Sequence, residues 1–390
     1  MNRPPLEVAD VLRAHGASYR EDYPVSREQS RVMRAIELCR TAALGGHVDA
    51  CNQCGHQVIS YNSCRNRHCP KCQSLAGAEW LEKRQEEFLP VDYFHVVFTV
   101  PEEVAPLALQ NQRVIYNILF RAVSQTLLKI AGDRKHLGAR IGFVAVLHTW
   151  GQNLHYHPHI HCVVPGGGLS PDGRDWIKPR GKKFFLPVAV LSRLFRGKFL
   201  AYLKSAYRKG QLKFHGRIEH LNNPVEFLKQ IQSCYKTNWV VYCKPPFGGP
   251  EKVLRYLSRY THRIAISNHR LVALRDGKVT FIWKDYRNGN RQATMTLDAV
   301  EFLRRFLLHV LPDGFVRIRH YGLLANPKRQ FHLAVCRQVL NVSSSNCLQQ
   351  NWRERYESVT GRLLDICPRC HQGRMIRIGI VLSSVYNNSS

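Results

Sequence analysis

The stretch His157-Pro158-His159-Ile160-His161-Cys162-Val163-Val164 decides the fold class of this chain. Its apolar residues predict a buried strand, and successive strand side chains point to opposite faces of a sheet. His159 and His161 therefore share one face, while the apolar residues beside them face the core. Two imidazoles with a third polar group can hold a divalent metal and leave positions open for substrate oxygens. A strand whose histidines are satisfied by hydrogen bonds alone has the same spacing, so other parts of the chain have to discriminate.

The segments around this strand predict further strands alternating with helices. Residues 93–100 (YFHVVFTV) are rich in aromatic and β-branched residues, and a proline ends them. Residues 103–130 carry apolar residues at helical spacing, and residues 141–150 (IGFVAVLHTW) predict a second strand. Residues 151–153 (GQN) are a turn signal. We therefore expect 141–150 and the histidine strand to form an antiparallel hairpin.

The hairpin brings a third histidine within reach of the pair. His148 can lie across from His159 and His161, which makes it a candidate third metal ligand. His155 and His157 compete for that role, because they lie equally close along the chain. The sequence leaves the third ligand open.

Two Cys-x-x-Cys knuckles near the N-terminus predict a zinc site. They are Cys51–Cys54 and Cys69–Cys72, with fourteen residues between Cys54 and Cys69. Each knuckle can bring two thiolates to one ion, and two knuckles complete a tetrahedral four-thiolate site at zinc-ribbon spacing. Further metal-binding residues surround the knuckles and could supply a second zinc site: Cys39, His47, Cys64 and His68. Arg65 and Arg67 lie within the module, so we expect its folded surface to contact DNA.

A third knuckle, Cys367–Cys370, lies near the C-terminus with His371 beside it. Cys336 and Cys347 are the nearest cysteines that could complete a site with it. Their spacing is irregular and does not match a ribbon.

The charge balance predicts a polyanionic partner. Lys and Arg number 57 against 28 for Asp and Glu, a formal net charge of +29. Such an excess, spread along the whole chain, makes nucleic acid the default candidate, and a solvated basic surface is the alternative. No apolar run reaches membrane-spanning length, and the first residues lack the apolar core of a signal peptide. We expect a cytoplasmic protein, in which thirteen cysteines serve metal ligation or remain buried thiols rather than forming disulfides.

Two tyrosines lie one helical turn apart in the segment Tyr256-Leu257-Ser258-Arg259-Tyr260. A spacing of four places both phenols on one helix face, with Arg255, Arg259 and Arg263 around them. A phenol is a poor nucleophile unless it and its electrophile are activated. A metal that polarises a phosphate, with arginines that stabilise developing charge, supplies such activation. Such a pair also occurs in ordinary helix packing.

Together these residues resemble the HUH nucleases, in which U is a bulky hydrophobe, through His159-Ile160-His161. The chain more closely resembles the two-tyrosine rolling-circle transposases of bacterial insertion sequences. The resemblance spans nearly the whole chain and rests on four segments: 62–70 (NSCRNRHCP), 147–152 (LHTWGQ), 157–161 (HPHIH) and 256–263 (YLSRYTHR).

The resemblance implies an α+β fold in which an antiparallel sheet, with helices on one face, carries the histidine pair on a central strand. It implies that His159, His161 and a third polar residue hold magnesium or manganese against a phosphodiester of single-stranded DNA. Tyr256 or Tyr260 then attacks, which gives a 5′-phosphotyrosyl link, and the second tyrosine accepts a second strand. The chain lacks a Gly-x-x-x-x-Gly-Lys-Ser/Thr phosphate loop, so unwinding would fall to a host helicase.

We expect three regions: a zinc- and DNA-binding module over 1–90, a catalytic domain over 91–290 with an insertion near 170–223, and a basic helical region over 291–390. The expected function is transposition of an insertion sequence, at the nucleoid or a plasmid. A plasmid replication initiator or relaxase of the same chemistry is an alternative. A non-catalytic, zinc-dependent nucleic-acid-binding protein is another.

Overall fold

The computed structural model describes residues 4–73, 77, 80, 87–181, 185–244, 264–285, 289, 291–342, 363 and 365–384. The chain divides into two compact units. Unit 1 comprises Met1–Lys83, His262–Val310 and Cys347–Ser390, and unit 2 comprises Arg84–Thr261 and Leu311–Asn346. The predicted regions 1–90, 91–290 and 291–390 follow the chain in order, whereas each unit is assembled from segments far apart in sequence.

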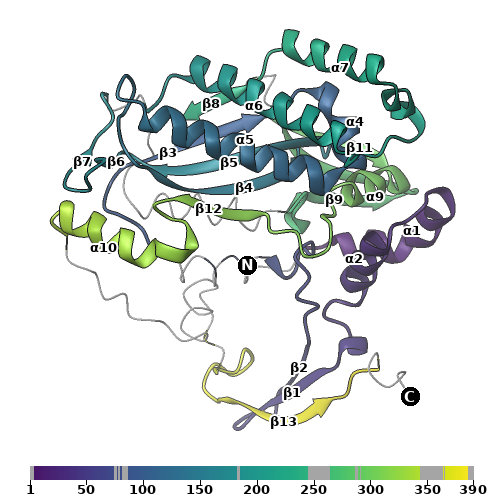
Figure 1. The fold of residues 1–390 in the computed structure, drawn as a ribbon. Helices are drawn as coiled ribbons and strands as arrows, with labels where there is room; N and C mark the ends of the chain where they lie inside the picture. The colour runs from purple at the N-terminus through teal and green to yellow at the C-terminus, as the bar shows by residue number, and fades with distance from the viewer. Residues whose placement is uncertain are drawn as a thin grey trace. The chain divides into compact units, whose positions relative to one another are not determined.

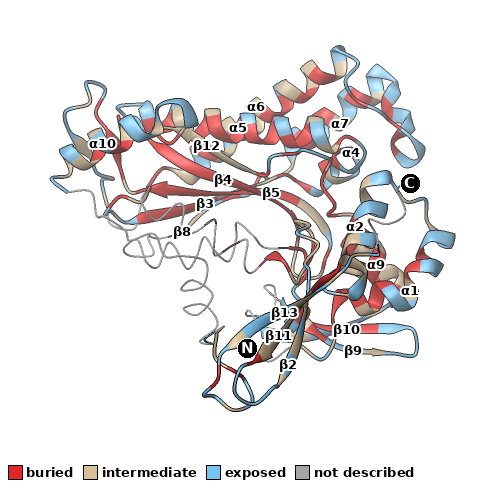
Figure 2. Cartoon of the chain, turned by 90° about the horizontal axis from the view of Figure 1, so that it is seen from below, coloured by how far each residue is buried: buried red, intermediate tan, exposed pale blue. Residues whose placement is uncertain are grey.

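Unit 2 is built on a five-stranded antiparallel sheet with strand order β12-β4-β5-β3-β8 (Figure 1). The strands are β3 (Tyr93–Thr99), β4 (Gly142–Trp150), β5 (Tyr156–Pro165), β8 (Val241–Lys244) and β12 (Ile318–Gly322). The predicted strands at 93–100 and 141–150 and the predicted hairpin are confirmed. Figure 2 shows the central strands β4 and β5 buried along most of their length, as their apolar sequences require.

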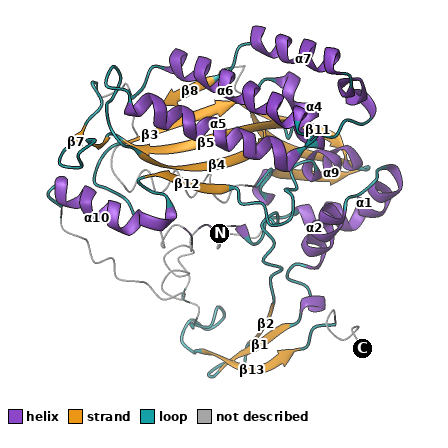
Figure 3. Ribbon diagram, in the orientation of Figure 1, coloured by secondary structure: helices purple, strands orange, loops and turns teal. Residues whose placement is uncertain are grey.

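Helices of unit 2 cover one face of this sheet, as predicted (Figure 3). They are α4 (Ala105–Gln110), α5 (Gln112–Gly132), α6 (Val188–Arg208) and α7 (Pro224–Lys236). The predicted helix over 103–130 is interrupted at Asn111, whose side chain bonds the backbone of Leu107 and Lys213. Ile160, Cys162 and Val164 of β5 lie in the core on the helical side. The alternation predicted for the histidine strand is therefore confirmed.

The segment predicted as an insertion near 170–223 contributes to this same core. Phe195, Phe199 and Leu200 of α6 are fully buried there, and Phe195 packs edge-on against Phe98 of β3. The apolar residues of α6 recur at helical spacing, which gives the helix one continuous face toward the sheet. Two short strands precede it, β6 (Gly168–Leu169) and β7 (Trp176–Ile177).

Unit 1 combines α-helices with small antiparallel sheets. The helices are α1 (Val8–Asp22), α2 (Arg27–Leu38) and α9 (Ala299–Leu307). One antiparallel sheet has the order β11-β10-β9, formed by β9 (Leu271–Arg275), β10 (Lys278–Asp285) and β11 (Arg291–Asp298). The other has the order β13-β1-β2, formed by β1 (Gly46–Cys51), β2 (Gln57–Tyr61) and β13 (Met375–Val381).

The predicted basic helical region over 291–390 is not one element of structure. Its residues supply α9 and β11 to unit 1, and β12 and α10 (Arg329–Val339) to unit 2. β13 returns to the N-terminal part of the chain and pairs with β1 in antiparallel register, from Gly46↔Val381 to Cys51↔Met375. The pairing of β1 with β13 was not predicted, because backbone pairing between distant segments leaves little local sequence signal. None of the described helices is long and apolar enough to cross a membrane.

Candidate functional site

Three histidines come together on the face of the unit 2 sheet opposite the core helices. His148 of β4 pairs directly with His159 of β5, and His161 follows two residues later on the same face. Each histidine offers one ring nitrogen, and these three nitrogens lie within 4.8 Å of one another. His148 and His161 are buried. The structure thus brings His148, one of the candidate third ligands, together with His159 and His161.

Hydrogen bonds orient two of these rings. His159 Nδ1 lies 2.7 Å from the carbonyl oxygen of His157. A carbonyl oxygen only accepts, so Nδ1 of His159 carries the proton and Nε2 keeps its lone pair. His161 Nδ1 lies 2.7 Å from Nε2 of His95. His148 stacks on Trp150, with ring centroids 4.7 Å apart.

His95 is a residue that the sequence analysis missed. It lies on β3 opposite Val163 of β5, and its side chain is 2% exposed. Burial lowers the pKa of His95 to about 3, with smaller effects from Lys244 and His159, so the ring is neutral at physiological pH. A signal was present in YFHVVFTV: strand alternation places His95 on the face that does not contain Phe94, Val96 and Phe98.

The two competing histidines lie outside the group. His155 is exposed, and its backbone N–H bonds Asn153. His157 contributes its carbonyl oxygen to His159, and its ring centroid is 5.5 Å from that of His159. The candidate third ligand favoured by the geometry is therefore His148.

Three imidazoles at this separation fit an octahedral divalent ion with open positions. Metal–ligand distances of about 2.1 Å place adjacent ligands roughly 3 Å apart and opposed ligands roughly 4.2 Å apart. One nitrogen of each ring lies within 4.8 Å of the others, a separation close to these values. If the three histidines bound such an ion, its remaining positions would be available to water or phosphate oxygens.

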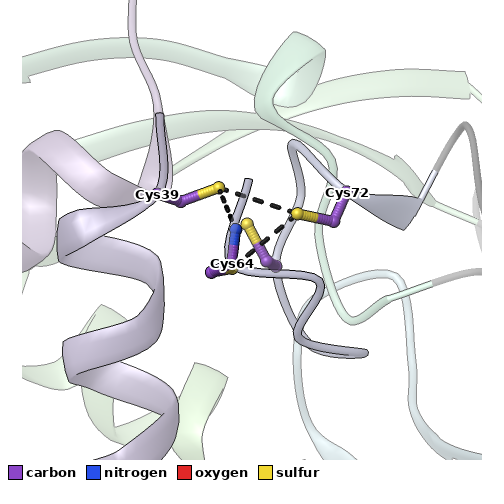
Figure 4. Close-up of side chains that lie close together, drawn as sticks. Cys39, Cys64 and Cys72 are labelled. Carbon is purple, nitrogen blue, oxygen red and sulfur yellow. Dashed lines mark hydrogen bonds between the residues drawn. The ribbon is translucent and has the colours of Figure 1, made fainter. Parts of the chain in front are cut away.

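Cys39, Cys64, Cys69 and Cys72 form a compact group in unit 1, called here the first cysteine group. Cys39 caps the end of α2, and the other three lie on the loop that follows β2. Cys72 Sγ lies 3.6 Å from Cys39 Sγ and 3.7 Å from Cys64 Sγ (Figure 4). Zinc bound to four thiolates at about 2.3 Å places the sulfurs about 3.8 Å apart. Hydrogen bonds from Cys64 and Cys69 lower the pKa of Cys39 to about 7, and the same hydrogen bonds to Cys39 raise the pKa of Cys64 and Cys69.

Cys51, Cys54, Cys367 and Cys370 form the second cysteine group. Cys51 Sγ lies 3.7 Å from Cys370 Sγ, and Cys54 Sγ lies 3.6 Å from Cys367 Sγ. Backbone N–H groups of Gln372 and Gly373 lower the pKa of Cys370 to about 6. These four thiols come from the two ends of the chain.

The pairing predicted for the two N-terminal knuckles is corrected by this arrangement. The expected single site of Cys51, Cys54, Cys69 and Cys72 is divided between the two groups, because β1 and β2 separate the first knuckle from the loop that carries the second. Cys39 and Cys64 complete one group. His47 and His68 belong to neither: His47 Nε2 lies 3.2 Å from a carboxylate oxygen of Asp49, and the backbone N–H of His68 bonds Asn66.

The partners suggested for the third knuckle also change. Cys336 is buried in α10 and belongs to neither group, and Cys347 lies outside the described residues. The predicted nucleophiles, Tyr256 and Tyr260, lie outside the described residues too, as do Arg255, Arg259 and Arg263. Of the predicted DNA contacts in the zinc module, Arg65 is exposed beside Cys64 and Arg67 is half-buried.

Comparisons with known proteins identify the chain. A family model described as "Transposase zinc-binding domain", from the IS91 group, matches residues 11–100. A second model, described as "Putative transposase", matches residues 142–330, the range that contains the histidine group. No solved structure matches the chain.

Two curated relatives agree with these matches. The chain is 58% identical over 387 residues to "Putative transposase y4qJ" of Sinorhizobium fredii, covering 97% of this chain and 96% of the relative. It is 29% identical over 291 residues to "Transposase for insertion sequence element IS801" of Pseudomonas savastanoi pv. phaseolicola, covering 74% of this chain and 68% of the relative. The chain therefore belongs to the IS91 family of insertion-sequence transposases with an N-terminal zinc-binding domain.

Proposed function

We propose that this transposase cleaves and rejoins single-stranded DNA through a covalent 5′-phosphotyrosine, with His148, His159 and His161 as the ligands of a magnesium or manganese ion. The observation that carries the proposal is the histidine group, in which three imidazoles on paired central strands converge within 4.8 Å. When bound there, the ion polarises a phosphate oxygen and stabilises the negative charge of the transition state. The family membership supports DNA as the substrate.

Residues of the chain would position the metal ligands and carry out the attack on DNA. Rigid central strands hold the histidine rings, and the bond to His157 presents Nε2 of His159 toward the ligand position. Tyr256 or Tyr260 attacks the phosphorus. A phosphorus–oxygen bond forms to the phenol as it loses its proton, and the bond to the 3′ oxygen breaks as that oxygen gains a proton. One phosphodiester replaces another, so a 3′ hydroxyl can later attack the phosphotyrosine, release the phenol and rejoin a strand without nucleotide hydrolysis, while the second tyrosine can accept a second strand.

The other predicted residues fit roles in binding and stability. Arg65 and Arg67 from the zinc module, with Arg255, Arg259 and Arg263, would neutralise DNA phosphates. The first cysteine group would hold a structural zinc, because its four sulfurs lie within 4.8 Å of one another and Cys72 lies at tetrahedral spacing from Cys39 and Cys64. A host helicase would supply single strands, at the nucleoid or on a plasmid.

The test is covalent trapping on single-stranded DNA that carries the ends of the element, with manganese and with chelator. Wild type is compared with Tyr256→Phe, Tyr260→Phe and His159→Ala. Tyr235→Phe on α7 is the matched control, since this tyrosine is 38% exposed and lies in the helical layer. We expect a manganese-dependent adduct that persists in Tyr235→Phe. It should disappear in His159→Ala and in the double variant Tyr256→Phe/Tyr260→Phe.

Tight DNA binding without an adduct on either strand would overturn the proposal and favour a non-catalytic zinc-dependent DNA-binding protein. A replication initiator or relaxase would form the adduct as well. The family match to transposases favours transposition over these two roles, and strand transfer between element ends and a target distinguishes them.

A further inference from the structure

The second cysteine group is built from two knuckles that repeat the same local structure. In the first, the N–H of Gly55 donates to the carbonyl of Cys51 over 3.1 Å. In the second, the N–H of His371 donates to the carbonyl of Cys367 over 3.0 Å. Gly55 and His371, which follow the last cysteine of each knuckle, both have positive φ, 66° and 57°. Two separate segments thus adopt one conformation around a common centre.

Both knuckles also aim backbone donors at their sulfurs. The N–H of Gln53 lies 3.4 Å from Cys51 Sγ, and the N–H of Arg369 lies 3.4 Å from Cys367 Sγ. The N–H of Gly373 lies 3.3 Å from Cys370 Sγ. Such donors stabilise negative charge on sulfur, and the thiolate is the form of cysteine that binds metal.

Packing around the group leaves no room for a side chain at position 373. A Cβ added at Gly373 would lie 2.3 Å from Cys51 Sγ. The backbone of the C-terminal knuckle therefore approaches the N-terminal sulfur as closely as a glycine allows. The sulfurs themselves stay apart: the 3.6 and 3.7 Å separations between knuckles match tetrahedral zinc and exceed the S–S bond length of about 2.05 Å.

We propose that Cys51, Cys54, Cys367 and Cys370 hold a second structural zinc ion, which clamps the C-terminal strand β13 to the N-terminal zinc module. The ion would join residues up to 319 positions apart in sequence. Binding releases the four thiol protons, so the site carries two negative charges, and Arg369 and Arg374 lie on the same knuckle segment. The matched zinc-binding model covers 11–100, so half of these ligands lie outside it.

The clamp has a consequence for assembly of the module. The pairing of β13 with β1 contributes the third strand of a small sheet, and sheets of two strands are marginal alone. Zinc at the second group would hold the end of β1 and the start of β13 together, because Cys51 pairs with Met375 in the sheet. The module is then complete only after the C-terminal knuckle has been synthesised.

The test measures zinc in the purified full-length protein by native mass spectrometry and elemental analysis. Wild type should carry two zinc ions per chain. Cys367→Ala/Cys370→Ala should carry one, and Cys243→Ser, on a half-buried cysteine of β8 outside both groups, should keep two. Cobalt exchange gives an independent readout, because tetrahedral thiolate coordination produces visible absorption that should fall by about half in the double variant.

Two results would overturn the proposal. One is a wild-type chain with a single zinc whose content the double variant does not change. The other is a wild-type mass that shows a disulfide within the second group in place of a metal. If the double variant folds poorly, the wild-type cobalt stoichiometry alone decides the question, with one or two ions per chain.

A second inference rests on the bond between His95 and His161 and depends on the proposed function. We infer that His95 is a positioning residue, whose Nε2 accepts the Nδ1 proton of His161 so that Nε2 of His161 faces the metal. The 2.7 Å separation between these nitrogens and the near-parallel rings, 3° apart, are those of a hydrogen bond in which the neutral His95 ring can be the acceptor. The bond to His95 would orient the ring of His161, as the bond to the carbonyl oxygen of His157 orients the ring of His159.

Manganese binding by the full chain, measured by calorimetry without DNA, tests this role. His95→Leu should weaken binding by about 10- to 100-fold, the usual effect of losing a hydrogen-bond partner of a metal ligand. His95→Gln should restore most of it, because its amide oxygen can accept at the position of Nε2. Equal affinities of wild type and His95→Leu would overturn the inference. No manganese binding by wild type would instead count against the proposed function.

Discussion

The cysteine groups and the histidine group differ in how they could coordinate a metal. Each cysteine group offers four sulfurs, and Sγ–Sγ separations of 3.6–3.7 Å within the groups match a closed tetrahedron. The histidine group offers three nitrogens on the sheet face opposite the core helices and would leave other metal positions open. Closed four-ligand sites are typical of structural metals, and open sites are typical of catalytic ones.

The difference also concerns where the ligands come from. The histidines lie on two neighbouring strands joined by a short turn, within fourteen residues of one another. The first cysteine group spans the end of α2 and a loop, and the second spans both ends of the chain. Metal binding should therefore contribute strongly to folding in unit 1 and little to folding in unit 2, where the apolar core already specifies the sheet.

The largest effect is expected from Cys69→Ser. Cys69 is completely buried in the first cysteine group, and structural zinc contributes about 10 kcal/mol or more to small zinc domains. We expect loss of one zinc and unfolding of the zinc module, measured by metal content and by proteolysis at the N-terminal segment. Cys243→Ser serves as the control. A variant that kept its zinc and its protease resistance would contradict the structural role.

The next effect is on activity, from His159→Ala. Loss of a direct ligand should lower the rate of DNA cleavage by more than the roughly 100-fold known for hydrogen-bond partners of ligands. The midpoint of thermal unfolding should change by only a few degrees, because His159 lies on the sheet face opposite the apolar core. His220→Ala, on an exposed histidine, controls for the general loss of a ring. A large fall in the midpoint of thermal unfolding of His159→Ala would contradict the predicted difference between the histidine group and the cysteine groups.

Chelation should separate the two kinds of site by rate. Excess EDTA is expected to abolish adduct formation within the mixing time, because three histidines hold a hard ion weakly. Zinc in the four-thiolate groups should be released far more slowly, as followed with a colorimetric zinc indicator. Simultaneous loss of zinc and activity would mean that the two kinds of site are not distinguishable in this way.

The smallest effect is expected from Gly373→Ala. The added methyl group collides with Cys51 Sγ, and overpacking of this kind costs about 1–3 kcal/mol. Zinc release from the second group should accelerate, while cleavage stays close to wild type. Gly379→Ala on β13, where an added Cβ meets nothing within 4 Å, is the matched control. Equal rates of zinc release from Gly373→Ala and Gly379→Ala would argue against a metal in contact with the Cys367–Cys370 knuckle.

Much of unit 2 follows from local sequence pattern. Alternation over 157–164 predicted which face of β5 joins the apolar core, and the turn at 151–153 predicted the pairing that sets His148 opposite His159. His95 was missed because a single histidine in an apolar strand has no spacing that marks it. Its role depends on the register between β3 and β5, which places it beside His161.

The grouping of the cysteines did not follow from spacing. Two knuckles fourteen residues apart fit a zinc ribbon, yet β1 and β2 lie between them and direct Cys51 and Cys54 away from Cys69 and Cys72. Ligand spacing restricts which residues can meet only when the intervening chain has no structure of its own. Here the intervening chain forms a hairpin.

By itself, the sequence determined the chemistry of this protein: thiols and imidazoles that bind metals, a strand with one apolar and one histidine face, and a cationic chain suited to DNA. These properties depend on residue type and on contacts between near neighbours. Only the tertiary structure decided which thiols share a site and which ring orients His161. Those pairings arise from strand register and from the return of β13 to β1, and long-range backbone pairing leaves no periodic trace in the sequence.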